Sequence, residues 1–136
     1  MKDTLKILLV DDEKIVGDRL KPALAKEGYR VEALMDPREA LRRIDENEFD
    51  IIVTDIMMED VGGIQILEAA MKKSYRTRVI VITGYANVNL AREAMEKGAF
   101  DIIEKPFRPG DLRNVIANAA KNIDINKEII SQSPPN

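Results

Sequence analysis

Short apolar runs alternate with segments of helical periodicity along this chain. Apolar residues at consecutive positions predict strands that are buried on both faces of a sheet, as in parallel sheets. We therefore expect five strands, at residues 5–10, 30–34, 51–54, 79–83 and 101–104. Strands that alternate with helices predict an α/β fold, here a doubly wound, five-stranded parallel sheet with right-handed crossovers and helices on both faces.

The segments between these runs carry the start and stop signals of helices. Asp36, Pro37 and Glu39 predict a helix start, with an N-cap aspartate, a proline in the first turn and a glutamate that closes a capping box. Gly28 and Gly98 predict the ends of two other helices, because glycine readily adopts the left-handed conformation of a C-terminal cap.

Two further residues modify the predicted helices. Pro22 lies inside the first apolar stripe and should kink that helix, because proline removes a backbone hydrogen bond and clashes with the preceding turn. Asn87 is the expected N-cap of the fourth helix.

The last helix is expected to begin at Pro109 and to outlast the sheet. Its apolar stripe should cover the sheet up to Ile123, which separates a domain at residues 1–123 from a helical extension and linker or tail at 124–136. Isoleucine recurs every seven residues, with one asparagine in the intervening series, which is typical of a short dimeric seam. Because isolated helices of this length are marginal in water, residues 123–130 are predicted to form a homodimer contact or to pack on a following domain. The residues of the repeat are Leu112, Ile116, Ala119, Ile123, Asn126 and Ile130.

Composition narrows the setting of the protein. The 136 residues fit one domain, and a net charge of −3 without a basic stripe argues against direct nucleic acid binding. The longest uninterrupted apolar run, residues 7–10, is far too short to cross a membrane. The sequence has no cysteine, which suits a cytoplasmic protein, and no histidine, which excludes imidazole ligands from this chain.

Polar residues follow or end four of the predicted strands. Asp11 and Asp12 follow the first strand, and Asp55 follows the third. Thr83 ends the fourth strand, and Lys105 follows the fifth. The carboxyl ends of parallel strands meet at one edge of an open sheet, where ligands bind. We therefore expect one pocket that can hold a divalent cation and accept a phosphoryl group on a carboxylate.

Each of these residues has an ordinary structural explanation when it is taken alone. Asp11 and Asp12 would cap a helix, Thr83 suits a strand, and Lys105 would be a solvated surface lysine. The set together needs another explanation, since two carboxylates 4 Å apart repel by about 4 kcal/mol at an effective dielectric near 20. Three converging carboxylates therefore indicate a cation between them.

These signatures resemble the receiver domain of two-component response regulators, the aspartate-phosphorylated modules of bacterial signalling. The resemblance covers residues 5 to about 123 and implies a flavodoxin-like sheet of strand order 2-1-3-4-5. It also implies a signalling domain that catalyses only its own phosphorylation and dephosphorylation. The matching segments are LLVDDE, VTDIMMEDVGG, VIVITGYA and GAFDIIEKPFRPGDL.

The resemblance implies a Mg²⁺ site among these residues. Asp12 and Asp55 would bind the ion directly, the backbone carbonyl of Met57 would add a third protein ligand, and Asp11 would act mainly through water. Such a set agrees with the preference of Mg²⁺ for oxygen ligands and retained waters.

The resemblance also implies the roles in phosphoryl transfer. Asp55 would take a phosphoryl group from a phosphohistidine of a sensor histidine kinase or a histidine phosphotransfer protein. Lys105 would screen the charge on the phosphoryl oxygens, as phosphoryl transfer requires. Thr83 would then move to bind a phosphate oxygen and switch the output surface.

One position departs from the family pattern. Ile102 stands three residues before Lys105, where the family usually has a tyrosine or phenylalanine whose ring moves with the threonine. Either the output surface works without this aromatic ring, or Tyr85 or Phe100 supplies part of the switch. A degenerate receiver that acts as a phosphorylation-independent interaction module is therefore an open alternative.

Two other functions fit the fold class but not the residues. A hydrolase of the haloacid dehalogenase type needs an acidic residue two positions after its nucleophile, where this chain has Met57. A flavodoxin-type module needs a phosphate-binding loop after the first strand, where Asp11, Asp12 and Glu13 would repel a phosphate. The sequence is compatible both with a stand-alone receiver and with a piece of a longer regulator. It does not identify the partner kinase or the signal.

Overall fold

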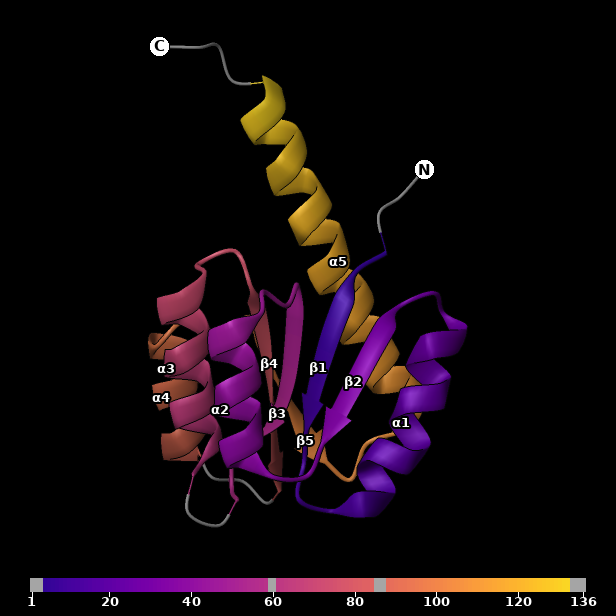
Figure 1. The fold of residues 1–136 in the computed structure, drawn as a ribbon, viewed down its shortest axis with the longest axis vertical. Coiled ribbons are helices and arrows are strands. Elements are labelled where there is room, and N and C mark those ends of the chain that lie inside the picture. Colours follow the sequence, from indigo (N-terminus) through magenta and orange to yellow (C-terminus); the bar gives the residue numbers. More distant parts are fainter. Residues whose placement is uncertain (1–3, 59–60, 85–87, 133–136) are drawn as a thin grey trace.

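A parallel sheet forms the centre of the protein (Figure 1). The structure is a computed structural model, which describes residues 4–58, 61–84 and 88–132, with side chains up to residue 124. Five strands in these residues are ordered β2-β1-β3-β4-β5, which confirms the predicted topology. Their bounds are β1 Lys6–Val10, β2 Arg30–Leu34, β3 Ile51–Asp55, β4 Arg78–Gly84 and β5 Asp101–Lys105.

Helices lie on both faces of the sheet, as predicted (Figure 1). Their bounds are α1 Lys14–Lys26, α2 Pro37–Glu46, α3 Gly63–Lys73, α4 Val88–Glu96 and α5 Pro109–Gln132. Helices α2, α3 and α4 pack over one set of strand residues, which includes Leu8 and Ile52. Helices α1 and α5 pack over the alternate set, which includes Leu9 and Val53. Because successive side chains of a strand point to opposite faces, both sets are buried, which explains the continuous apolar runs.

Several predicted helix ends are confirmed. The Arg38 backbone N–H donates to Asp36 Oδ1 at 2.9 Å, so Asp36 caps α2, and Pro37 follows it. Gly28 and Gly98 have φ angles of +98° and +105°, in the left-handed region that other residues rarely adopt. These two glycines end α1 and α4 as the sequence indicates.

Other details of the helices differ from the prediction. Glu39 does not close a capping box, because its carboxylate accepts hydrogen bonds from the Arg42 guanidinium one turn along α2. Helix α1 runs from Lys14 to Lys26 as one element with Pro22 inside it, and the kink expected at this proline stays a prediction. The cap expected at Asn87 lies outside the described residues.

Helix α5 outlasts the sheet. It projects beyond the sheet at the end opposite to the carboxyl ends of the strands (Figure 1). Ile123 is still buried against the core, and the helix continues to Gln132, so Ser131 and Gln132 are helical rather than part of a tail. Pairing of residues 123–130 stays a prediction. None of the helices in the described residues is long and apolar enough to cross a membrane.

Candidate functional site

The register of the sheet brings the predicted site residues to one edge. Asp55 ends β3 and lies opposite Ile82 of β4. Lys105 ends β5 and lies opposite Gly84 of β4. Thr83 stands between these two positions of β4, so the acceptor candidate, the hydroxyl and the lysine occupy three neighbouring strand ends.

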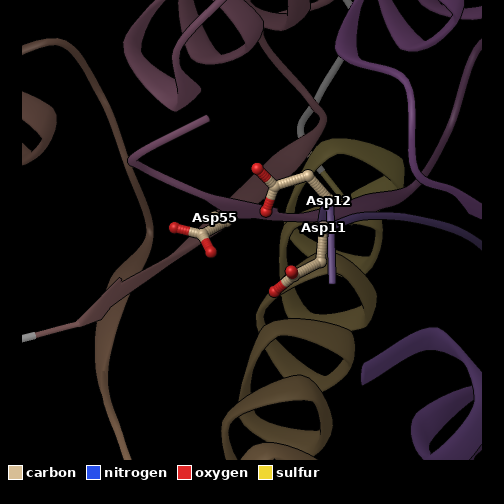
Figure 2. Close-up of side chains that lie close together, drawn as sticks. All are labelled: Asp11, Asp12 and Asp55. Atoms are coloured by element: carbon tan, nitrogen blue, oxygen red, sulfur yellow. The ribbon is translucent and has the colours of Figure 1, made fainter. Parts of the chain in front are cut away.

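Three carboxylates converge at this edge (Figure 2). One oxygen from each of Asp11, Asp12 and Asp55 lies within 4.8 Å of the others. Asp11 and Asp55 are 2% and 5% exposed, whereas Asp12 is exposed. Their mutual repulsion is strong because two of the three are shielded from water. Carboxylate oxygens packed in this way can hold a divalent cation.

Lys105 supplies positive charge to this cluster. Its Nζ lies 2.9 Å from Asp55 Oδ2, 3.2 Å from Asp11 Oδ2 and 3.1 Å from Glu13 Oε1. Burial by itself would lower the pKa of Lys105, but the hydrogen bonds to Asp55 and Glu13 and the charge of Asp11 outweigh burial and raise it. The ammonium therefore stays protonated, and it balances only part of the surrounding negative charge.

Asp11 is the least satisfied member of the cluster. Its Oδ1 accepts a hydrogen bond from the Glu13 backbone N–H at 2.8 Å. Its Oδ2 is buried and accepts no hydrogen bond from the described residues, although the Lys105 ammonium is within ion-pair distance. Burial raises the pKa of Asp11, and the charge of Asp55 adds to this effect. The Lys105 ammonium is shared with Asp55 and Glu13, so this buried oxygen can accept a further positive group beside it.

The backbone after Asp55 is held tightly against helix α3. The Met57 N–H donates to Asp55 Oδ1 at 3.0 Å, and the Gly63 N–H donates to the Ile56 carbonyl at 3.0 Å. A Cβ atom at Gly63 would lie 2.4 Å from the Asp55 carbonyl oxygen. Gly63 is therefore required for the close approach of α3 to the acceptor strand.

The residues expected to couple the site to a surface lie on different layers. Thr83 is 2% exposed at the end of β4. Ile102 packs with the cluster beneath α2, α3 and α4, whereas Phe100 packs with the cluster beneath α1 and α5. Tyr85 lies outside the described residues. Phe100 and Ile102 thus face opposite layers of the sheet, and only Ile102 shares a layer with α4.

Glu13 belongs to the site but was not among the predicted site residues. It is the N-cap residue of α1, and its carboxylate contacts the Lys105 ammonium. Its position directly after Asp11 and Asp12 was a signal in the sequence. That signal did not reveal the contact, because the position of Glu13 relative to Lys105 depends on the order β1-β3-β4-β5 across the sheet.

An open groove of about 1100 Å³ adjoins the cluster. It is lined by Asp55 and Lys105 at one side and by apolar residues of α1 and of the segment after β5 at the other. Ile15 and Met57, which line it, are 56% and 59% exposed. Its apolar lining includes Ile15, Met57, Pro106 and Phe107. The Asp55 carboxylate thus lines a groove that also has exposed apolar side chains.

Comparison with known proteins gives a consistent picture. The family model for the response regulator receiver domain matches residues 7–117. The regulatory protein AtoC of Escherichia coli (strain K12) is 36% identical over 124 residues, which cover 91% of this chain and 27% of AtoC. This chain therefore spans less than a third of the length of that relative.

Solved structures of similar chains share the fold. A response regulator receiver domain protein (CheY-like) from Methanospirillum hungatei JF-1 has a TM-score of 0.87 and 31% identity, covering 91% of this chain and 99% of that one. NtrX from Brucella abortus has a TM-score of 0.88 and 28% identity, covering 96% of this chain and 30% of NtrX.

Proposed function

Because this chain belongs to the response regulator receiver domain family, we propose that it accepts a phosphoryl group on Asp55 from a phosphohistidine of a partner protein. Receiver domains are signalling modules of two-component systems, as the resemblance indicated. The observation that carries the proposal is the contact between the Lys105 ammonium and Asp55 Oδ2 at 2.9 Å, beside two further carboxylates. This arrangement combines an acceptor oxygen with a fixed cation.

The carboxylate cluster fits a Mg²⁺ ion. One oxygen from each of Asp11, Asp12 and Asp55 lies within 4.8 Å of the others. Asp11 Oδ2 is buried and has no hydrogen-bond partner in the described part of the chain, with the Lys105 ammonium at ion-pair distance. Both features suit a hard cation with oxygen ligands. When bound, the ion would neutralise the cluster and screen the charge of a phosphoryl group. The carbonyl of Met57 is proposed as the remaining protein ligand.

Three residues of this chain have separate roles in the proposed phosphoryl transfer. An Asp55 carboxylate oxygen attacks the phosphorus of the donor, the bond from phosphorus to the histidine nitrogen breaks, and that nitrogen keeps the electron pair and takes a proton from solvent. The product is an acyl phosphate on Asp55. The Lys105 ammonium stabilises charge on the phosphoryl oxygens, and Thr83 donates a hydrogen bond to one of them.

The groove beside the cluster supports the proposed partner. A histidine kinase or phosphotransfer protein has to place its phosphohistidine over Asp55, and apolar side chains around the acceptor favour docking of a protein surface. Ile15 and Phe107 flank the groove on its α1 side and on the side after β5. We propose that these residues contact the partner.

The proposal is tested with beryllofluoride, a stable mimic of the phosphoryl group. With Mg²⁺ present, it should shift the amide NMR signals of Asp55, Thr83 and Lys105, and a chelator should reverse the shifts. The Asp55→Asn variant should not respond, whereas Asp45→Asn, an exposed aspartate of α2, should respond like the parent. If the spectrum of the parent does not change when beryllofluoride and Mg²⁺ are added, the result would favour a phosphorylation-independent interaction module instead.

A further inference from the structure

Lys105 is shared between a buried carboxylate and an exposed one. Asp55 has 7% of its side chain exposed, whereas Glu13 has 60% exposed, and both lie within hydrogen-bond distance of the Lys105 ammonium. Glu13 is thus the exposed carboxylate that holds this ammonium at the entrance of the site. It is not one of the three carboxylates, Asp11, Asp12 and Asp55, that converge on one another.

The local structure explains why the Glu13 side chain is available. Glu13 is the N-cap residue of α1, a position whose side chain usually accepts a hydrogen bond from the first turn of the helix. Its side chain makes no such capping bond. Its backbone N–H is fixed instead by Asp11 Oδ1 at 2.8 Å, which leaves the carboxylate to reach Lys105. A helix start without its usual cap, beside a reactive group, is the kind of local exception expected at a functional site.

We propose that Glu13 is a positioning residue that holds the Lys105 ammonium in the unphosphorylated protein and competes for it with the phosphoryl group on Asp55. This inference rests on the function proposed above. The phosphoryl group on Asp55 carries a charge of roughly −1.5 to −2, which exceeds the single charge of the carboxylate that it replaces. The ammonium then bonds to the phosphoryl oxygens, and its bond to Glu13 has to break. Glu13 therefore contributes to the free energy that is needed to move the Lys105 ammonium from its position in the unphosphorylated protein to its position beside the phosphoryl oxygens.

A matched pair of variants tests this role. Glu13→Gln and Glu104→Gln remove the same charge near Lys105, but Glu104 is not among the carboxylates in contact with its ammonium in the described residues. At saturating Mg²⁺, Glu13→Gln should bind beryllofluoride about two- to fivefold more tightly than the parent, the change expected from the free energy of one exposed ion pair. Glu104→Gln should differ little from the parent, and Glu13→Asp should fall between the parent and Glu13→Gln.

A second readout separates positioning from a general effect of charge. In the parent, the Lys105 ammonium should be ordered, and its ¹⁵N signal should be sharp, before beryllofluoride is added. In Glu13→Gln this signal should broaden, whereas in Glu104→Gln it should not. Equal affinities for beryllofluoride in the two glutamine variants, or an ordered ammonium in Glu13→Gln, would overturn the inference. If the parent itself failed to bind beryllofluoride, the proposed function would fail first, and the two failures are therefore distinguishable.

Discussion

The Lys105 ammonium lies 2.9 Å from Asp55 Oδ2, although fifty residues separate the two in the chain. β4 lies between the strands that end in these residues, and the register of the sheet places the two ends opposite Ile82 and Gly84 of β4, at one edge of the sheet. The contact therefore depends on the order of the strands and on no local feature of the sequence. It brings the acceptor and the cation of the proposed reaction together before any donor binds.

The first prediction concerns metal. Mg²⁺ should stabilise the folded protein by about 2.7 kcal/mol at a concentration one hundred times its dissociation constant, because the carboxylate cluster forms only in the folded state. Asp12→Asn should remove most of this gain, whereas Asp45→Asn, far from the cluster on α2, should leave it intact. Thermal unfolding with and without Mg²⁺ measures the effect. A melting temperature of the parent that is indifferent to millimolar Mg²⁺ would count against the site.

The second prediction concerns the glycine that adjoins the acceptor strand. Gly63→Ala should destabilise the protein by about 1–3 kcal/mol, the usual cost of overpacking, because its Cβ would meet the Asp55 carbonyl oxygen at 2.4 Å. It should also slow phosphorylation by displacing the Asp55 backbone.

Gly62→Ala is the matched control for this substitution. Its Cβ would lie 3.3 Å from the Ile56 carbonyl oxygen, a contact that a small shift relieves. Urea unfolding of the two variants tests the claim, which fails if Gly63→Ala is as stable as Gly62→Ala.

The third prediction concerns pH. The Arg43 guanidinium hydrogen-bonds to Glu32 and lowers the pKa of this carboxyl below its ordinary value of 4.5. The ion pair therefore stabilises the fold above that ordinary value, and its contribution is lost as the pH falls through the lowered value in the folded state. Because both side chains are about one-third exposed, Glu32→Gln should cost up to about 1 kcal/mol at neutral pH.

Urea unfolding at neutral pH and at about pH 3 measures this dependence. The difference between the parent and Glu32→Gln should shrink at the acidic pH. A difference that is constant over this range would mean that the ion pair contributes nothing to stability.

The fourth prediction concerns the end of α5. The helix runs past the sheet, and the heptad spacing of Ile116, Ile123 and Ile130 predicts pairing of residues 123–130 with a second copy or a following domain. Sedimentation of the full chain should show self-association at high protein concentration that a chain ending at Asn122 lacks. Identical monomeric behaviour of both chains would leave the extension without a pairing role.

Much of the fold was predictable because its strands are buried on both faces. Runs such as residues 51–54 admit few other structures, and the carboxyl ends of such strands have to meet at one edge. The positions of Asp55, Thr83 and Lys105 followed from this rule alone. Gly28 and Gly98 were recognisable as helix ends because their function is local.

The rest depended on contacts that no short segment of sequence contains. Gly63 is a point of close packing against the Asp55 carbonyl, which depends on how α3 packs on β3. Glu39 was expected to cap α2, but the long Arg42 side chain one turn further on competes for it. Glu13 meets Lys105 only through the packing of four strands, β1, β3, β4 and β5.

The central claim is that Asp55 accepts a phosphoryl group from a phosphorus–nitrogen donor. Phosphoimidazole, a small mimic of phosphohistidine, should phosphorylate the parent in the presence of Mg²⁺, and peptide mapping by mass spectrometry should locate the phosphoryl group on Asp55. Asp55→Asn should gain no phosphoryl group, whereas Asp50→Asn, at the opposite end of β3, should be modified like the parent. Phosphorylation of Asp55→Asn to the same extent as the parent, or a parent that stays unmodified, would contradict the account.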